Sequence, residues 1–489
     1  MQPAQPRLAE VVAAISLATD LGMGQPLQHA LRTCVIATRL AEAAGLPPEE
    51  LPVVYYAALL RYLGCTADAH MMSAVFGDEI AARAAFATID PASTREQLGW
   101  LIRHAGGPRK LVAAMAGGEG EVYATACEVG RRLAERLGLP PAVQRALVQS
   151  FERWDGKGFP AGLRGDEICA ASRVVAIARD AEVFSRAGTA VDVIGARSGY
   201  DPRLAAVFRR DAAELLADPG AAWDAALAAE PPPRRHVGDL DATCRAIADF
   251  ADLKTPWTVG HSTGVAELAE AAAWRLGLEA AEIRRAALVH DLGRVGVPNS
   301  IWERPGPLAP DELERVRLHP YLTERVLMHA PALAPLAEIA ALHHERLDGS
   351  GYHRGCAAQQ LPAGARVLAA ADVFHAMTEP RPHRPARDDA PARLEDEVRA
   401  GRLDADAAEA VLHAAGERTT VDRPRPAGLT DREVEVLRLV ARGHTNRSIA
   451  AALGIATKTA GHHVEHIYAK TGCATRAGAA LFASEHDLL

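Results

Sequence analysis

The chain has 489 residues, which is too long for a single hydrophobic core and suggests about three domains. Hydrophobic residues make up 49% and charged residues 24%, as is usual for soluble globular proteins. The net charge of −8 excludes a general attraction to nucleic acid, so any DNA contact must come from a local patch. Aromatic residues are scarce and alanine is abundant, which predicts an all-α protein because alanine loses least on entering a helix.

Cysteine usage and the N-terminal stretch both predict a cytoplasmic protein. The seven cysteines are scattered and include no CxxC pair, which is typical of reduced thiols. Glu10 and Asp20 interrupt the first apolar stretch, so it does not resemble a signal peptide. No apolar run approaches the roughly 20 residues of a membrane-spanning helix, and we expect no membrane partner.

An internal repeat organises the first 416 residues. The segment ERWDGKGFP at 152–160 recurs as ERLDGSGYH at 345–353, 193 residues later. The same offset relates Arg173 to Arg366, and each of them opens an apolar run. We therefore predict two homologous helical domains over 7–215 and 236–416, separated by a proline-rich segment that breaks helices.

A third domain is predicted after a polar, proline-rich linker at 417–428. Apolar residues recur at helical spacing over 429–489. Thr430 followed by Glu433 forms a capping box that marks a helix start. Gly443 and Gly454 stand where helices should end.

The second domain contains an ordered series of potential metal ligands. Its imidazoles and carboxylates suit iron, manganese or zinc, and no thiolate is among them. Such a set is large enough for two metal ions, which together can promote phosphoester displacement. The alternative, independent surface or core histidines, explains one histidine better than a whole series. The series is His261, His290, Asp291, His319, His343, His344 and Asp372.

This domain resembles the HD-GYP family of phosphohydrolases over about 180 residues. The motifs that carry the resemblance occur in family order: HDLGRVGVPNSIWERPGPL, then HP, HHERLDGSGY and AAADVFHAM. The resemblance implies a helical bundle with two divalent metal ions, iron or manganese. It also implies a nucleotide ligand, namely a cyclic dinucleotide and chiefly cyclic di-GMP, which is linearised by hydrolysis.

The resemblance also implies roles for individual residues. Asp291 would bridge the metals in catalysis, and Arg294 would contact the phosphate and contribute to catalysis. Gly349, Gly351 and Tyr352 would belong to a loop that faces the nucleotide. The terminal metal ligands would be His261, His290, His319, His343, His344 and Asp372.

Three positions depart from the family pattern. Arg294 replaces the usual lysine, and it keeps the charge but changes the geometry. His353 replaces the proline of the GYP signature. Trp257 stands where members with a third metal carry glutamate, so we expect at most two ions. These departures leave the substrate open.

The first domain lacks the metal motif. Arg61-Tyr62 and Ser150-Phe151 replace the HD and HH pairs, and Arg179 stands at the position of the last aspartate. A guanidinium repels a divalent cation. We expect a structural or sensory role for this degenerate domain, with retained catalysis as the less favoured alternative; a glycine-rich loop remains at 154–163.

Residues 429–489 resemble the LuxR-type helix-turn-helix DNA-binding domain almost from end to end. The resemblance implies four helices, of which the third, at 457–470, enters the major groove. The expected base-edge contacts are Lys458, Thr459, His462 and His463, and the expected backbone contacts are Arg447 and Lys470. A protein-interaction module is the alternative, because seven basic and six acidic residues leave a net charge of only +1. We therefore expect a homodimer on DNA.

Two functions remain open at this stage. The chain is either a metal-dependent phosphohydrolase fused to a transcriptional regulator, or a transcription factor that senses a nucleotide without hydrolysing it. A scaffold with neither activity is a third, less favoured possibility.

Overall fold

The computed structural model describes residues 5–107, 110, 119–416, 426–486 and 488–489. Apart from isolated β-bridges, the ordered elements in these ranges are helices, which confirms the predicted all-α class. None of the described helices has the length and apolar character needed to cross a membrane. Most of the predicted linker 417–428 lies outside the described residues.

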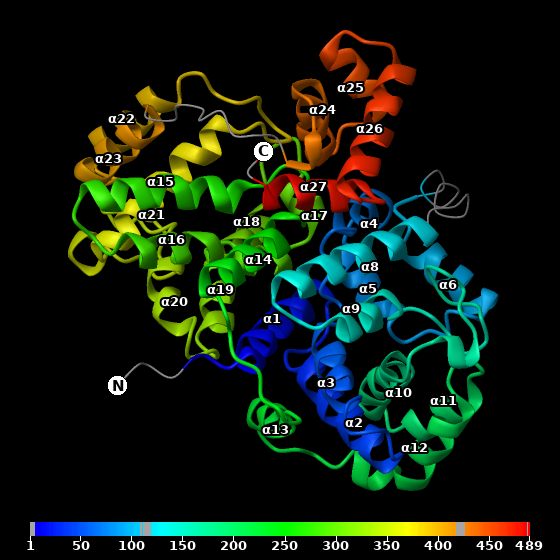
Figure 1. Ribbon diagram of the computed structural model, residues 1–489. Helices are drawn as coiled ribbons and strands as arrows, with labels where there is room; N and C mark the ends of the chain where they lie inside the picture. The colour runs from blue at the N-terminus through cyan, green and yellow to red at the C-terminus, as the bar shows by residue number, and fades with distance from the viewer. Residues whose placement is uncertain (1–4, 108–109, 111–118, 417–425, 487) are drawn as a thin grey trace. The chain divides into compact units, whose positions relative to one another are not determined.

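The chain divides into two compact units, Met1–Leu240 and Asp241–Leu489. The helices of the first unit (Figure 1) are α1 (Leu8–Gly22), α2 (His29–Ala43), α3 (Leu51–Leu60), α4 (Ala69–Phe76), α5 (Glu79–Phe86), α6 (Thr94–His104), α8 (Glu119–Arg136), α9 (Pro141–Val148), α10 (Ala170–Ser185), α11 (Ala190–Ala196), α12 (Pro202–Leu215) and α13 (Ala222–Ala228).

The centre of the first unit is formed by α2, which packs against α3 and α10, while α3 also packs against α9. The segment that follows the prolines at 231–233 is hydrogen-bonded to the first residues of the chain that the structure describes. Val237 N donates to Pro6 O at 2.8 Å, and Leu8 N donates to Arg235 O at 2.9 Å. These bonds tie residues 235–237 to the first unit, whereas the sequence placed the start of the second domain at 236.

The second unit begins with helices that carry the metal motif. They are α14 (Leu240–Asp252), α15 (His261–Arg275), α16 (Ala280–Val289), the 3-10 turn η2 (Leu292–Gly296), α17 (Asn299–Trp302), α18 (Pro310–Arg317), α19 (His319–Leu327), α20 (Ala334–Ala340), α21 (Ala363–Thr378), α22 (Ala390–Arg399) and α23 (Ala405–Gly416).

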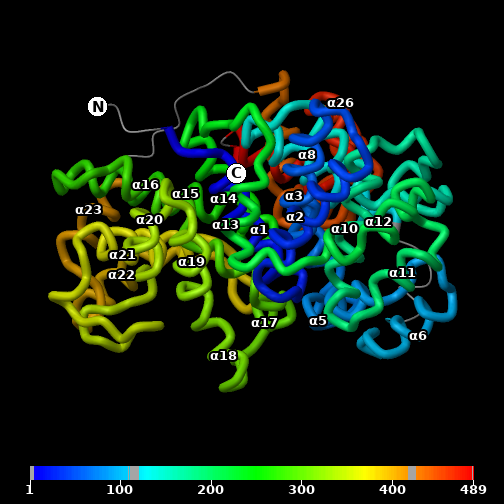
Figure 2. The backbone as a smooth tube through the Cα atoms, turned by 90° about the horizontal axis from the view of Figure 1, so that it is seen from below, coloured from blue at the N-terminus to red at the C-terminus, as the bar shows by residue number. Residues whose placement is uncertain are grey.

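The central packing of the second unit repeats that of the first. Helix α15 packs against α16 and α21, and α16 packs against α20; Figure 2 shows these four helices together. His29 and His261 each begin a helix, after a residue in the left-handed conformation: Gln28 with φ 75° and Gly260 with φ 82°. The structure is therefore consistent with the tandem repeat expected from the sequence.

The C-terminal helices form a small domain with its own apolar core. Thr430 caps the first of them and Glu433 completes the capping box, as predicted. Gly443 and Gly454 adopt positive φ where the first two helices end, which confirms both predicted stops. The helices are α24 (Asp431–Ala441), α25 (Asn446–Leu453), α26 (Thr457–Thr471) and α27 (Arg476–Glu485).

The capping box generates a stability prediction. Burial alone would raise the pKa of Glu433, but hydrogen bonds from Lys470 and Thr430 lower it from 4.5 to about 2. The lowered pKa stabilises the fold at neutral pH, and the contribution disappears as the pH falls from about 4.5 to about 2. We expect Glu433→Gln to destabilise α24 by about 1 kcal/mol at pH 7.

Hydrogen exchange of α24 amides in the full chain measures this effect. Glu435→Gln on the same helix is the control, because Glu435 is exposed and pairs only at the surface with Arg432. Equal exchange in the two variants at pH 7 would contradict the prediction, and the difference should shrink near pH 3.

Candidate metal centre

The seven predicted ligands, although distant in sequence, come together inside the second unit. All are buried except His344, whose side chain is 22% exposed. Most of them stand at helix ends, where the chain changes direction. His261 begins α15, His290 and Asp291 lie between α16 and η2, His319 begins α19, His343 and His344 follow α20, and Asp372 lies within α21.

The Asp291 carboxylate lies between two sets of imidazoles. Its Oδ2 atom is 3.9 Å from His261 Nε2 and 3.5 Å from His290 Nε2. Its Oδ1 atom is 3.4 Å from His319 Nε2 and 3.6 Å from His343 Nε2. One carboxylate therefore faces both halves of the cluster, one oxygen toward each.

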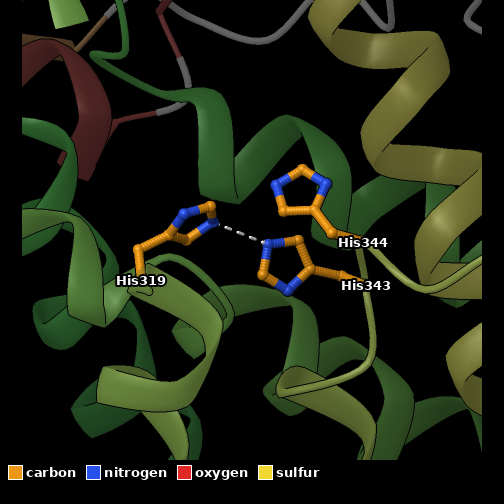
Figure 3. Close-up of side chains that lie close together, drawn as sticks. All are labelled: His319, His343 and His344. Carbon is orange, nitrogen blue, oxygen red and sulfur yellow. Dashed lines mark hydrogen bonds between the residues drawn. The ribbon is translucent and has the colours of Figure 1, made fainter. Parts of the chain in front are cut away.

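Each half supplies three further ligand atoms within 4.8 Å of one another. The first half consists of His261, His290 and Asp372, with His261 Nε2 at 3.2 Å from Asp372 Oδ1. The second half consists of His319, His343 and His344 (Figure 3). There His319 Nε2 and His343 Nε2 are 3.1 Å apart.

Backbone carbonyls fix the orientation of three of the imidazoles. The Nδ1 atoms of His290, His319 and His343 each lie 2.6 Å from the carbonyl oxygen three residues earlier. A proton on Nδ1 leaves Nε2 with a lone pair directed at the cluster. Because these contacts use the local backbone, each ring is oriented by its own segment.

The electrostatics favour the metal-binding forms of most of these groups. Burial lowers the pKa of His319 to about 3, and burial with the charge of His343 lowers the pKa of His344, so both rings are neutral at pH 7. Burial would raise the pKa of Asp291, but Arg294 and His290 hold it well below its usual range. The carboxylate thus remains ionised.

His261 differs from the other rings. Burial disfavours its protonated form, but the charge of Glu379 and the hydrogen bond to Asp372 outweigh this and raise the pKa of His261 to about 10. The same negative surroundings attract a metal cation to Nε2.

Two orphaned atoms show that the donors fit metal ions. Of the side-chain atoms of the seven ligands, His290 Nε2 and Asp291 Oδ1 are buried without a hydrogen-bond partner. Such atoms cost free energy unless something compensates them. Each faces one half of the cluster, and imidazole nitrogen with carboxylate oxygen is a donor set suited to iron, manganese or zinc.

Arg294 lies beside the cluster, between Asp291 and the Trp302 ring. Its Nη1 donates to Asp291 Oδ2 at 2.8 Å, and its guanidinium lies 4.1 Å from the centre of the Trp302 ring. Trp302 Nε1 also donates to Arg294 O at 3.3 Å. The aromatic ring attracts the cation and restricts its position, and the remaining N–H groups can still donate to an anion.

The predicted substrate loop is adjacent to the cluster. The Tyr352 ring packs on His344 with centroids 4.7 Å apart. Gly349 has φ +77°, and a Cβ on Gly351 would lie 2.4 Å from Glu345 Cα, so both glycines are needed for the path of the backbone. Glu345 accepts hydrogen bonds from the N–H groups of residues 354–356 and holds the loop closed.

The corresponding place in the first unit is built differently. The Arg61 guanidinium lies 5.2 Å from the Phe151 ring centre and 5.7 Å from the Tyr62 ring centre. His29 contacts the Glu182 carboxylate. A cation and two aromatic rings therefore occupy the positions that carry HD and HH in the second unit.

The predicted DNA contacts lie mainly on α25 and α26. Lys458, Thr459 and His462 are exposed at the start of α26, and His463 is half-buried. Arg447 is exposed on α25. Lys470 is engaged within the domain, because its amine bonds Glu433 at 2.7 Å and Gly428 O at 3.1 Å.

The chain belongs to the HD domain family, whose pattern matches residues 118–204 and 245–407, slightly more than half of the chain. Residues 427–483 match the luxR family of bacterial regulatory proteins. The chain thus joins an HD-GYP phosphohydrolase-type region to a LuxR-type helix-turn-helix domain. Both resemblances drawn from the sequence are confirmed.

The relatives include cyclic-dinucleotide phosphodiesterases. The 3'3'-cGAMP-specific phosphodiesterase 3 of Vibrio cholerae is 29% identical over 409 residues, covering 78% of this chain and 88% of its own. A cyclic di-GMP phosphodiesterase of Thermotoga maritima is 35% identical over 183 residues, or 36% of this chain and 49% of its own. The crystal structure of V-cGAP3, a cyclic GMP-AMP-specific phosphodiesterase of V. cholerae, gives a TM-score of 0.56 at 26% identity, covering 85% of this chain and 99% of that one.

Sequence reasoning missed three residues around the site. Glu345 could have been found, because the repeat places Glu152 at the same position, and Glu152 likewise accepts backbone N–H groups. Trp302 lies within the motif that begins at His290, but that motif gives it no role, and Glu379 lies outside the family motifs. Their roles depend on contacts with Arg294 and His261 that only the folded chain creates.

The close approach at Gly351 can be tested directly. We expect Gly351→Ala to destabilise the second unit by about 1–3 kcal/mol, because its Cβ would overlap the Glu345 backbone. Gly306→Ala is the matched control, since a Cβ there meets no atom within 4 Å. Thermal unfolding of both variants provides the measurement, and identical curves would contradict the packing argument.

Proposed function

We propose that the second unit is a two-metal phosphodiesterase that converts a cyclic dinucleotide to its linear form. The observation that carries this proposal is the position of Asp291, whose two oxygens each face one half of the ligand cluster. Further support comes from relatives named as cGAMP and cyclic di-GMP phosphodiesterases. The donor set favours iron or manganese.

The seven side chains of the cluster would hold the ions, with Asp291 bridging them. Bound ions would supply Lewis acidity at the phosphodiester and promote attack by water. Arg294 would donate its remaining N–H groups to a phosphate oxygen, with its guanidinium held beside the Trp302 ring. Tyr352 offers an aromatic surface beside His344 on which a base can stack.

The double variant His290→Ala with Asp291→Ala tests the metal site. Removing one ligand and the shared carboxylate should abolish both bound metal and hydrolysis. Metal analysis and a hydrolysis assay with cyclic di-GMP and 3'3'-cGAMP provide the readouts. The control is His329→Ala, two residues after α19, combined with Asp311→Ala on α18. Full activity in the first variant would refute the site.

A nucleotide sensor without turnover is a second candidate, favoured by one contact. The Arg294 guanidinium bonds Asp291 Oδ2, the same oxygen that faces His261 and His290. A cation there competes with a metal ion. Ligand binding that shifts DNA affinity without forming a linear product would select this function over catalysis.

We further propose that the C-terminal domain binds DNA as a homodimer, with α26 in the major groove. The exposed first turns of α26 support this geometry. The C-terminal domain has a small net charge, so a single copy would bind DNA weakly. A dimer bound to two half-sites is therefore needed.

Arg447→Ala tests the expected contact with the DNA backbone, because Arg447 is exposed on α25. Removing one phosphate contact should reduce the slope of log affinity against log salt by about 1. The measurement is a salt titration with duplex DNA. Arg399→Ala on α22, whose side chain is 70% exposed, is the control. An unchanged slope for Arg447→Ala would exclude Arg447 as a phosphate contact.

A further inference from the structure

The four buried imidazoles of the cluster are not oriented in the same way. His290, His319 and His343 direct Nδ1 at a carbonyl three residues earlier. His261 is the first residue of α15, and its Nδ1 instead lies 2.8 Å from Glu379 Oε2. The orientation of this ring therefore depends on a side chain 118 residues away.

Glu379 comes directly after α21, the helix that also carries Asp372. The two carboxylates contact opposite nitrogens of the same ring: Asp372 Oδ1 is 3.2 Å from His261 Nε2, and Glu379 is at Nδ1. Glu379 is in turn held by Arg381, whose Nη2 donates to it at 2.8 Å while Nη1 donates to Trp257 O, also at 2.8 Å.

We propose that Glu379 is the positioning residue that fixes His261 as a metal ligand, an inference that rests on the proposed metal site. By accepting a proton from Nδ1, its carboxylate leaves the Nε2 lone pair for an ion. Glu379 lies two residues beyond Met377, the last residue of the AAADVFHAM motif.

The first unit provides an internal comparison. There the carboxylate on the corresponding imidazole is Glu182, which contacts His29 Nδ1 and Arg186. The residue 193 positions after Glu182 is His375, and Glu379 stands one helical turn further on. The second unit thus makes the same carboxylate–imidazole contact from a different position.

His375 occupies the space beside the pair. Its Nδ1 lies 3.2 Å from His261 Nδ1, and a Cβ on Gly264 would come within 1.9 Å of His375 Nε2. The absence of a side chain at Gly264 is therefore what admits the His375 ring.

His261, His375 and Glu379 could instead hold a cation of their own, since their ligand atoms lie within 4.8 Å of one another. The Arg381 guanidinium argues against this, because its Nη2 lies 3.3 Å from His261 Nδ1 and 2.8 Å from Glu379. A fixed positive charge at that distance repels a metal ion. The geometry favours a positioning role.

Glu379→Ala tests the role. Without the carboxylate, the Arg381 N–H groups remain next to Nδ1 and favour the tautomer that carries its proton on Nε2, which cannot bind a metal. Titration of the full chain with Mn²⁺ alone should show one of two sites weakened about 10–100-fold and the other unchanged. Glu338→Ala, an exposed residue on α20, should leave both sites unchanged.

A rescue variant separates positioning from a merely structural effect. His375→Glu combined with Glu379→Ala places the carboxylate where Glu182 stands in the first unit, and should restore most of the lost affinity. The proposal would be overturned if Glu379→Ala left Mn²⁺ binding unchanged or weakened both sites equally. It would also be overturned if the rescue variant did not regain Mn²⁺ affinity. Three Mn²⁺ ions in the wild type, with one lost in Glu379→Ala, would assign Glu379 to a third site instead. Failure of the wild type to bind Mn²⁺ would count against the proposed function itself.

Discussion

The site depends on one buried negative charge, the Asp291 carboxylate, and on what surrounds it. A buried carboxylate is costly unless it is paired or bound to metal. Here Arg294 pairs with one oxygen, and imidazole nitrogens surround both. Because each oxygen faces a different set of imidazoles, the same residue contributes to both halves of the cluster. A neutral side chain at this position would remove the negative charge that the surrounding imidazoles share.

The helical scaffold brings the ligands together by placing them at its ends. His261 and His319 begin helices, while His290 and the pair His343-His344 follow them. At such positions the backbone turns, so side chains from different helices can converge on one point. The alanine-rich faces of α15 and α21 are buried and let these helices pack closely, which brings Asp372 to His261. The fold and the site therefore draw on the same helix packing.

The two units show how one scaffold supports different chemistry. In each unit a histidine begins the central helix, and its Nδ1 contacts a carboxylate. In the first unit this carboxylate is Glu182 on α10, and in the second it is Glu379 directly after α21. In the first unit Arg61, which lies near the Tyr62 and Phe151 rings, stands where the second unit has a metal-ligating histidine. If the chain couples nucleotide binding to DNA binding, the ligand must favour one conformational state over another, because equal affinity for both would shift neither.

The sequence by itself determined the helical class, the repeat, the ligand series and the capping and stop residues of the C-terminal domain. These depend on local propensity and on motifs contiguous along the chain. Tertiary structure alone decided that Glu379 contacts His261 Nδ1, that the Arg294 guanidinium lies over the Trp302 ring, and that Lys470 is engaged with Glu433. Glu379 and Lys470 lie far along the chain from their partners. Arg294 and Trp302 share one motif, but the motif does not show that their side chains meet. These contacts therefore arise only when the chain folds.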